Sequence, residues 1–368
     1  MNHRLEKLHQ KLDENGLDAI LISQAGNRRY LSGFTGSAGF LLVTEKSAIL
    51  ATDFRYTEQA QAQAPDFEIF RSEGEPEKWL PDLISSLDVK RVGFEANDIS
   101  FSTYRKLIAT EGEKELVPTE ELVESLRAIK DETELEFITK AVELTDAVFE
   151  QVAPKIQPGM KEKEVAWEIE KSLREKGSES VPFDLIVASG PNSAWPHAKP
   201  SDRALLPGEP VVIDIGARCE GYSGDLSRTI FIGNEDKTFA KIYDLVLGAQ
   251  LTAIATIEAG MSGEQADALA RTVIEQGGYG EAFGHGLGHG IGLAPHELPR
   301  LGRESSTVLS NGMVFTIEPG IYVKGWGGVR IEDVVVLEKG KARVLSQAKK
   351  WIDRPNLAAI AIERNTGI

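Results

Sequence analysis

The sequence predicts an α+β protein of two domains, in which a smaller α/β domain precedes a larger domain built from two similar halves. Three observations predict this fold. The chain has 368 residues, which is enough for two domains of ordinary size. Its first third alternates short apolar runs with polar helical stretches, as α/β domains do. Its later part repeats a pattern at an interval of about 100 residues, which indicates two related structural units.

The first domain is predicted to begin with an amphipathic helix and to continue with short buried strands. Three leucines recur at helical spacing before a glycine that can end the helix: Leu5, Leu8, Leu12 and Gly16. Apolar runs between Gly and Ser turns predict strands over residues 18–23, 39–43, 47–51 and 89–94. Residues 27–39 are expected to form a glycine-punctuated loop that could contact substrate or a neighbouring subunit.

A change in character near residue 128 marks the expected boundary between the two domains. Asp131 is a candidate N-cap and Glu134 follows three residues later, which is the pattern of a capping box. A long amphipathic helix is predicted from there to about Val152. We therefore expect an N-terminal domain, a second domain and a C-terminal extension that packs on it or contacts a partner subunit: residues 1–128, 129–346 and 347–368.

The second domain contains an internal repeat. Residues 156–160 (IQPGM) and 257–261 (IEAGM) are similar, and a helical stretch follows each of them. Later in each half an apolar strand carries one carboxylate, Asp214 in the first half and Glu318 in the second. Two such units predict a pseudo-symmetric domain whose halves bring equivalent carboxylates face to face.

Asp214 interrupts an apolar strand, and an unpaired carboxylate there costs several kcal/mol to bury. Asp225 lies beyond a turn near Cys219. A hairpin centred between residues 219 and 220 would place Asp214 and Asp225 directly opposite each other, on the same face. Two carboxylates at that separation repel strongly unless a proton or a metal ion lies between them.

A second pair of carboxylates repeats this arrangement. Glu318 and Glu332 flank a glycine-rich turn, so they too are expected to face each other across a hairpin. One such pair could arise by chance or mark a surface salt bridge. Two pairs on repeat-related hairpins, both in apolar strands, favour a metal site instead.

Glycine occupies every even position from 284 to 292. In a strand this pattern would place His285, Leu287, His289 and Ile291 on one face, with room for close backbone packing behind them. An isolated histidine is best explained as a hydrogen-bonded structural residue. Two histidines on such a strand, near four paired acids, indicate metal ligands.

Four carboxylates with one or two histidines form an oxygen-rich ligand set. Such a set suits Mn²⁺ or Co²⁺ better than a closed structural zinc site. Four acids also exceed what one catalytic ion needs, which favours two ions bridged by carboxylates and a hydrolytic reaction. The single cysteine, Cys219, excludes a disulfide framework and a cysteine-based zinc or iron–sulfur site.

The composition excludes several other classes of function. Lys and Arg number 41 against 57 Asp and Glu, a formal charge of −16, and no basic block offsets it. Nucleic acid and anionic membranes are therefore not expected partners; the acidic excess serves solubility or cation binding. The longest apolar runs, such as residues 210–213, fall far below the roughly 20 residues of a membrane span. Residues 1–6 lead into no apolar signal stretch, so we expect a cytoplasmic protein.

These motifs, in this order, resemble the pita-bread metallopeptidase family, which includes methionine aminopeptidase, aminopeptidase P, prolidase and the metal-free creatinase. Its ligand order of Asp, Asp, His, Glu and Glu is matched by Asp214, Asp225, His289, Glu318 and Glu332. The matching segments are IDIG at 213–216, GDLSRT at 224–229, GHGIG at 288–292, IEPG at 317–320 and RIED at 330–333. The implied fold is a pita-bread catalytic domain preceded by a creatinase-like α/β domain, whose pattern residues 27–39 and 52–56 also resemble.

The resemblance implies a role for each matching residue. Asp214 would bind one ion, His289 and Glu318 would bind the other, and Asp225 and Glu332 would bridge the two. Glu318 would also shuttle the proton of the bridging water, which acts as the nucleophile.

Further residues match family positions around the ligands. His197, His285 and His296 would position substrate and stabilise the tetrahedral oxyanion or the leaving proline nitrogen. Arg330 could hold a substrate carboxylate. Tyr322 also stands in a family position, with ordinary packing as its alternative explanation.

We therefore predict a dinuclear metallopeptidase that cleaves the bond between an N-terminal residue and proline in short proline-containing peptides. The creatinase-like domain points to this proline-directed branch, of prolidase or aminopeptidase P type. Mn²⁺ is the expected metal, with Co²⁺ and Zn²⁺ as alternatives, and the resemblance implies a homodimer. A metal-free peptide-binding relative would lack ligands that are all present here. A two-metal phosphoesterase would be expected to carry a phosphate-binding glycine loop or a basic cluster, and neither accompanies this site.

Overall fold

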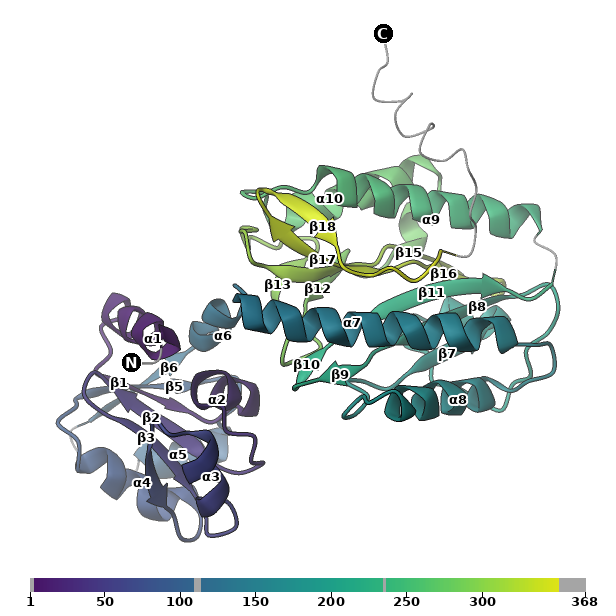
Figure 1. Cartoon of the computed structure of the whole chain (residues 1–368). Helices are drawn as coiled ribbons and strands as arrows, with labels where there is room; N and C mark the ends of the chain where they lie inside the picture. Colours follow the sequence, from purple (N-terminus) through teal and green to yellow (C-terminus); the bar gives the residue numbers. More distant parts are fainter. Residues whose placement is uncertain (1–2, 109–113, 234–235, 351–368) are drawn as a thin grey trace. The chain divides into compact units, whose positions relative to one another are not determined.

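The computed structural model describes residues 3–108, 114–233 and 236–350 (Figure 1). The chain divides into two compact units, Met1–Arg127 and Ala128–Ile368. Residues 351–368, most of the expected C-terminal extension, lie outside the described residues.

The first unit is an α/β domain, as predicted. In its described residues one six-stranded sheet has the order β4-β3-β2-β1-β5-β6, with parallel pairs at both edges and antiparallel pairs around β2. The strands are β1 (Ala19–Ile22), β2 (Phe40–Thr44), β3 (Ala48–Thr52), β4 (Glu68–Arg71), β5 (Arg91–Glu95) and β6 (Glu115–Thr119). The helices are α1 (His3–Glu14), α2 (Ala25–Ser32), α3 (Thr57–Gln63), α4 (Pro76–Ser85), α5 (Phe101–Ile108) and α6 (Leu122–Arg127).

One expected loop of this domain is partly a helix. The expectation for residues 27–39 was wrong over its first half, because α2 extends to Ser32 and only the part from Gly33 onward is irregular. The helix begins where the Gln24 side chain accepts the backbone N–H of Asn27 at 2.8 Å, and it ends at Gly33, whose φ is 78°. Glutamine is an uncommon cap, so the local sequence carried a weak helix-start signal.

The second unit is built around sheets and hairpins that lie between two pairs of helices (Figure 1). Helices α7 and α8 lie on one side, and α9 and α10 on the other. The helices are α7 (Glu132–Val152), α8 (Glu162–Glu175), α9 (Lys237–Thr256) and α10 (Gly263–Gln276). The first half holds the sheet β11-β8-β7 and the hairpin β9-β10: β7 (Ile186–Ser189), β8 (Pro210–Ile215), β9 (Arg218–Cys219), β10 (Tyr222–Ser223) and β11 (Leu226–Phe231).

The second half holds the sheet β13-β12-β14-β17-β18 and the hairpin β15-β16. Its strands are β12 (Gly288–Gly290), β13 (Glu297–Leu301), β14 (Val314–Ile317), β15 (Gly320–Val323), β16 (Gly327–Arg330), β17 (Asp333–Glu338) and β18 (Lys341–Val344). Short 3₁₀ helices occur at Ala153–Lys155, Gly190–Ala194 and Gly280–Ala282. None of the helices in the described ranges combines the length and the hydropathy needed to cross a membrane.

Equivalent hydrogen bonds show the internal repeat. The N–H of Gly159 donates to Leu205 O at 2.8 Å, and the N–H of Gly260 donates to Leu309 O at 2.9 Å. Both glycines have positive φ, 90° and 94°, which glycine adopts at little cost. A helix follows each of them, α8 in the first half and α10 in the second. The predicted pseudo-symmetric α+β fold is therefore confirmed.

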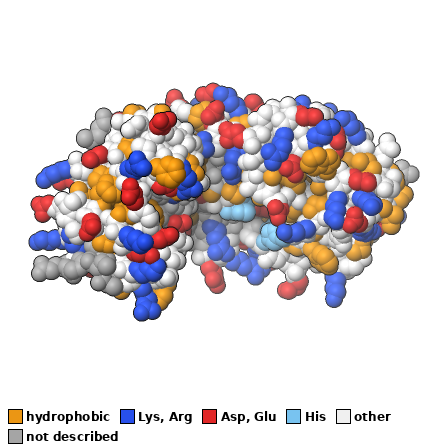
Figure 2. Space-filling view, turned by 90° about the horizontal axis from the view of Figure 1, so that it is seen from below, with side chains coloured by type: hydrophobic (Ala, Val, Ile, Leu, Met, Phe, Trp, Pro, Cys, Tyr) orange, Lys and Arg blue, Asp and Glu red, His pale blue; other side chains and the backbone are white. Residues whose placement is uncertain are grey.

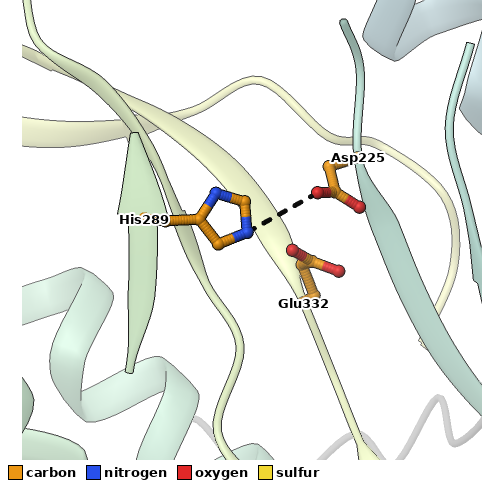
Figure 3. A group of neighbouring side chains, drawn as sticks. All are labelled: Asp225, His289 and Glu332. Atoms are coloured by element: carbon orange, nitrogen blue, oxygen red, sulfur yellow. Dashed lines mark ion pairs between the residues drawn. The ribbon is translucent and has the colours of Figure 1, made fainter. Parts of the chain in front are cut away.

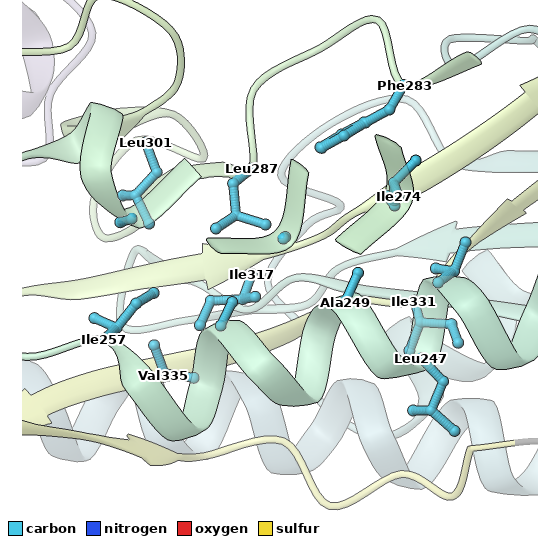
Figure 4. Packing of buried hydrophobic residues seen from close by; sticks show 14 of the residues in the cluster. Leu247, Ala249, Ile257, Ile274, Phe283, Leu287, Leu301, Ile317, Ile331 and Val335 are labelled. Atoms are coloured by element: carbon cyan, nitrogen blue, oxygen red, sulfur yellow. The ribbon is translucent and has the colours of Figure 1, made fainter. Parts of the chain in front are cut away.

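The core of the second half packs α9 and α10 against the sheet (Figure 4). Leu247 and Ala249 of α9 and Val335 of β17 belong to this buried cluster. Each fully buried large aliphatic side chain contributes about 1.5–3 kcal/mol. Ile317 and Ile331 are also fully buried in it, and each directly precedes a carboxylate in the chain. Successive side chains of an extended chain point to opposite sides, so packing of these isoleucines turns the carboxylates away from the core.

The surface carries charges of both signs. In the view of Figure 2, lysine and arginine side chains are interspersed with aspartate and glutamate, and pale blue histidine side chains reach the surface of this face. This face therefore offers no extended basic area for a polyanion.

Candidate metal centre and active site

A cavity of about 540 Å³ in the second unit is lined by all five predicted metal ligands. These are Asp214, Asp225, His289, Glu318 and Glu332. Four further predicted site residues line the same cavity, namely His197, His285, His296 and Arg330. Tyr322 is not among the lining residues of this cavity, but its hydroxyl contacts two side chains that are.

Strands from both halves of the unit supply the five side chains. Asp214 lies in β8 and Asp225 directly precedes β11, both in the first half. His289 lies in β12, Glu318 directly follows β14, and Glu332 directly precedes β17, all in the second half. The pseudo-symmetric arrangement therefore brings residues more than a hundred positions apart to one place.

The first carboxylate pair is not in the expected register. Asp214 pairs with Ser227 rather than with Asp225, because the turn includes Glu220 and Gly221, both with positive φ, and its centre lies one residue later than expected. This changes the pairing by two residues. A shift of two keeps every side chain on its original face, so Asp214 and Asp225 still face the same side.

The second carboxylate pair agrees with the expected pairing. The β14–β17 and β15–β16 ladders keep one register on both sides of a short break. If that register is continued between the Ile317–Asp333 and Gly320–Arg330 pairs, Glu318 lies opposite Glu332. Neither residue belongs to a strand there. The turn contains Gly325, whose φ of 82° favours glycine.

The glycine-alternating segment is a strand for three residues only. The expectation of one long face was wrong, because Leu287 and Ile291 lie in two separate apolar clusters instead of lining the cavity with the histidines. The close backbone packing is present. A Cβ on Gly288 or Gly290 would lie 2.0 Å from a carbonyl oxygen of a neighbouring strand. These glycines let β13 and β14 approach the backbone that carries His289.

Three of the predicted ligands form a compact triad (Figure 3). Asp225, His289 and Glu332 each offer a ligand atom, and these atoms lie within 4.8 Å of one another. His289 Nε2 lies 3.7 Å from Asp225 Oδ2. Its Nδ1 lies 3.1 Å from the carbonyl oxygen of Gly290, which can only accept, so Nδ1 carries a proton. This bond directs Nε2 to the acids, as in histidines that bind metals.

Asp214 and Glu318 flank the triad. Glu318 Oε1 lies 3.3 Å from His289 Nε2 and accepts the hydroxyl of Thr316 at 3.1 Å. Asp214 Oδ2 accepts Arg330 Nη2 at 2.6 Å, whereas its buried Oδ1 has no hydrogen-bond partner in the described part of the chain. A buried carboxylate oxygen without a donor requires another explanation, and a cation provides one. Four carboxylates and one imidazole fit divalent ions such as Mn²⁺.

The crowding of carboxylates changes their acidity. Burial raises the pKa of Asp225 and of Glu332 well above the usual range, and neighbouring carboxylates raise it further. Burial also raises the pKa of Asp214, although the charge of Arg330 opposes it. Ionisation of all these groups together is therefore unfavourable without a cation between them.

Glu318 and His289 form the exception. Burial alone would raise the pKa of Glu318, but the hydrogen bond and charge of His289 lower it to about 2. Burial opposes the charged form of His289, yet Glu318 raises the pKa of His289 overall. Glu318 is therefore the carboxylate best able to stay ionised in the metal-free site.

His285, which precedes β12 in the chain, is held through both of its ring nitrogens. His285 Nδ1 donates to Gly286 O at 2.7 Å, and its Nε2 lies 2.9 Å from Tyr322 Oη. Burial lowers the pKa of His285, so the neutral ring accepts the hydroxyl proton of Tyr322 at Nε2. Both ring nitrogens are engaged within the protein.

His296 and His197 have exposed side chains that line the cavity. The ring of His296 packs against that of His289 with 4.1 Å between the ring centroids. Burial and the charge of His289 lower the pKa of His296. A neutral imidazole there can donate a hydrogen bond into the cavity.

Arg330 is directed into the protein. Only 3 % of its surface is exposed. Its guanidinium donates to Asp214, to Ser227 Oγ at 2.7 Å, to Tyr322 Oη at 2.9 Å and to Pro196 O at 3.3 Å. These contacts suit a residue that orients Asp214 better than one that receives a substrate carboxylate.

Arg300 and Thr316 also contribute to the site, and neither was predicted from the sequence. Arg300 of β13 pairs directly with His289 of β12, and it lines the cavity with an exposed side chain. His296 lies just before β13, whose pairing with β12 shifts register after His289, so its spacing of four from Arg300 did not report a shared face. Thr316 lies two residues before Glu318 in an extended segment, and that spacing was the available signal for Thr316.

Comparison with known proteins covers both units. Residues 136–339 match metallopeptidase family M24, and residues 4–129 match the creatinase/prolidase N-terminal domain. An Xaa-Pro dipeptidase of Pyrococcus horikoshii is 36% identical over 95% of this chain and 98% of its own length. Two solved structures each match 95% of this chain and 98% of their own. The Xaa-Pro dipeptidase of Bacillus anthracis has a TM-score of 0.92 at 42% identity, and an X-Pro aminopeptidase of Thermotoga maritima 0.87 at 38%.

Proposed function

Because the chain belongs to metallopeptidase family M24, we propose that it is a dinuclear metal-dependent peptidase that hydrolyses the Xaa-Pro bond of short peptides, with Xaa-Pro dipeptides as its main substrates. The observation that carries this proposal is the convergence of four carboxylates and one histidine on a single cavity. Relatives named as Xaa-Pro dipeptidases support the substrate class.

The donor set fits two divalent ions, and Mn²⁺ is the proposed metal. Asp225 and Glu332 would bridge the ions, Asp214 would complete one site, and His289 with Glu318 would complete the other. When bound, the ions supply an activated water and polarise the scissile carbonyl group.

The chain's own residues then provide proton transfer and charge stabilisation. Glu318 would accept a proton from the attacking water and pass it to the proline nitrogen as the C–N bond breaks. His296 and His197 donate hydrogen bonds to the carbonyl oxygen as it becomes negative. Arg330 and Tyr322 hold Asp214 and His285 in place from behind the cavity.

The cavity wall supports a small peptide with an apolar side chain and a terminal carboxylate. Its lining includes apolar side chains, namely Phe183, Leu185, Ile186 and Pro196. Arg300 and Lys199 line the same cavity; Lys199 already contacts Asp184 at 3.1 Å, and Arg300 can pair with the carboxylate of a dipeptide. We therefore assign carboxylate recognition to Arg300 in place of Arg330.

The discriminating experiment compares Ala-Pro with Ala-Pro-Ala on metal-stripped enzyme to which Mn²⁺ has been returned. Faster turnover of the dipeptide supports the proposal. Faster turnover of the tripeptide would instead assign an aminopeptidase P-type activity, as in the Thermotoga maritima relative. The homodimer implied by the family resemblance stays a prediction, which sedimentation of the full chain would test.

A further inference from the structure

The segment that follows the last strand of the sheet is bound into the second unit. Residues 345–350, here called the C-terminal strap, form no regular secondary structure. The N–H of Gln347 donates to Asp146 Oδ2 of α7 at 2.6 Å, and the N–H of Lys349 donates to Glu150 Oε1 at 2.6 Å. Ser346, itself 5 % exposed, accepts the N–H of Val334 at 2.9 Å. The strap thus joins α7 to β17 through individual polar contacts.

The strap also reaches a buried arginine between the two halves. Arg228 of β11 donates through Nη2 to Asp333 Oδ1 and to Ala348 O of the strap, each at 2.7 Å. Lys350 of the strap lies 2.8 Å from the other oxygen of Asp333. The side chains of Arg228 and Asp333 are each 1 % exposed, whereas that of Lys350 is 25 % exposed, so the Arg228–Asp333 pair is shielded from water and Lys350 covers its edge. The strap therefore supplies both an acceptor for Arg228 and a second cation for Asp333.

Arg228 in turn holds the backbone of Glu332. Its Nη1 donates to the carbonyl oxygens of Glu332 and Ser227. The N–H of Glu332 donates to Ser227 O at 3.0 Å. Both backbone polar groups of Glu332 are thus fixed by the strand that begins directly after Asp225. The two acids assigned as bridging ligands come from different halves, and this junction links the backbone segments that carry them.

We propose that the C-terminal strap is a positioning element of the metal centre: through Ala348 O and the Lys350 ammonium it holds Arg228 and Asp333 so that Glu332 keeps its place beside Asp225. This inference rests on the proposed two-metal site and assigns a role to the described part of the C-terminal extension. Partners that orient metal ligands from behind typically account for about 10–100-fold in metal affinity.

The test compares two neighbouring lysines of the strap. Lys350→Met removes the ammonium from Asp333, whereas Lys349→Met removes an exposed charge and keeps the backbone N–H that binds Glu150. Co²⁺ is titrated into each metal-stripped full-length protein, with affinity measured by calorimetry and ligand geometry by the visible absorption of bound Co²⁺. We expect Lys350→Met to weaken Co²⁺ binding about tenfold and to change the absorption bands, and Lys349→Met to match the wild type.

A second, milder substitution keeps the inference testable if Lys350→Met does not fold. If Lys350→Met does not fold, Ser346→Ala removes one strap contact, and a loss of Co²⁺ affinity of a few-fold is expected there. Co²⁺ affinity and spectrum equal to those of Lys349→Met in whichever variant folds would overturn the proposal. The wild-type titration distinguishes failure of this inference from failure of the proposed function. If the wild type itself binds no Co²⁺, the proposed metal site is wrong; if it binds Co²⁺ and the variants match it, only the role of the strap is wrong.

Discussion

Arg330 Nη2 donates to Asp214 Oδ2 at 2.6 Å, across the junction of the two halves of the second unit. The contact joins β16 to β8, which are 116 positions apart at these residues. Tyr322 Oη accepts a hydrogen bond from the same guanidinium at 2.9 Å and donates its own to His285 Nε2. One buried cation thus orients a candidate metal ligand and, through a tyrosine, a histidine on the cavity wall.

Arg330 and Arg300 are expected to differ in their kinetic roles. Arg330→Met removes the donor to Asp214, so kcat for Ala-Pro should fall by about 10–100-fold with little change in KM. Arg300→Met removes a cation that lines the cavity, so KM should rise instead. Steady-state kinetics on both variants check this. Equal effects of the two substitutions on KM would contradict the division of roles.

Asp225 is expected to be essential for metal binding but not for folding. Asp225→Asn keeps the size of the side chain and removes the charge assigned to the bridge, so Mn²⁺ binding and Ala-Pro turnover should both be lost. Its far-ultraviolet circular dichroism should match that of the wild type. Full activity with bound metal in this variant would contradict the ligand assignment.

His296 is expected to act on substrate rather than on metal. His296→Ala removes a hydrogen-bond donor aimed at developing negative charge, a kind of contact worth about 10²–10³-fold in kcat. Bound Mn²⁺, measured by elemental analysis, should be unchanged. Turnover at the wild-type rate would return His296 to a structural role.

The metal-free protein is expected to lose stability as the pH rises. Burial raises the pKa of Asp225 and Glu332 in the folded state, and it raises that of Asp146 to about 6. The folded state therefore binds more protons than the unfolded state between about pH 4 and neutrality, and stability falls as the pH increases through this window. His289 acts in the same direction because its pKa is also raised, whereas the lowered pKa values of His285 and His296 oppose the trend below about pH 6.5. Glu318 has a lowered pKa and opposes the trend only below about pH 4.5.

Mn²⁺ should reverse this dependence, because a cation compensates ionised carboxylates. Thermal melts with and without Mn²⁺ at pH 5.5 and 7.5 check this, with the larger increase in Tm expected at pH 7.5. A metal-free Tm that rises between these pH values would contradict the assignment of the shifted groups.

The glycine-rich segment that carries His289 is expected to tolerate alanine at Gly284 but not at Gly290. A Cβ on Gly290 would lie 2.0 Å from a backbone carbonyl oxygen, whereas a Cβ on Gly284 meets nothing within 4 Å. Gly290→Ala should therefore reduce the free energy of unfolding by about 1–3 kcal/mol or more, and Gly284→Ala should change it much less. Urea denaturation of both variants measures the difference. Similar midpoints would show that the strands do not pack as closely as described.

Local patterns predicted much of this fold and placed the candidate ligands. The capping box at Asp131 and Glu134 is present, and α7 runs to Val152 as the apolar periodicity indicated. The glycine-rich turn between Glu318 and Glu332 correctly predicted that these two residues lie opposite each other. Strands β4 and β6 were missed, because they are half-exposed edge strands without an apolar run.

What the sequence did not predict depends on contacts between distant residues. The hairpin after Asp214 extends one residue further than a count of positions suggested, because Glu220 adopts positive φ beside Gly221. The engagement of Arg330 by Asp214 joins separate halves of the unit, and no local pattern reports it. For this reason a carboxylate-binding role was expected of Arg330 and is now proposed for Arg300.

The proposed function requires five side chains to hold two divalent ions that drive peptide hydrolysis. It is tested most directly by titrating Mn²⁺ into the metal-stripped wild type while Ala-Pro turnover is followed in the same samples. We predict that activity is absent at first, that it returns with bound metal and that binding saturates at two ions per chain. Two results would contradict this prediction: turnover of Ala-Pro by protein shown to be free of metal, or the absence of bound Mn²⁺ at saturating Mn²⁺ concentrations.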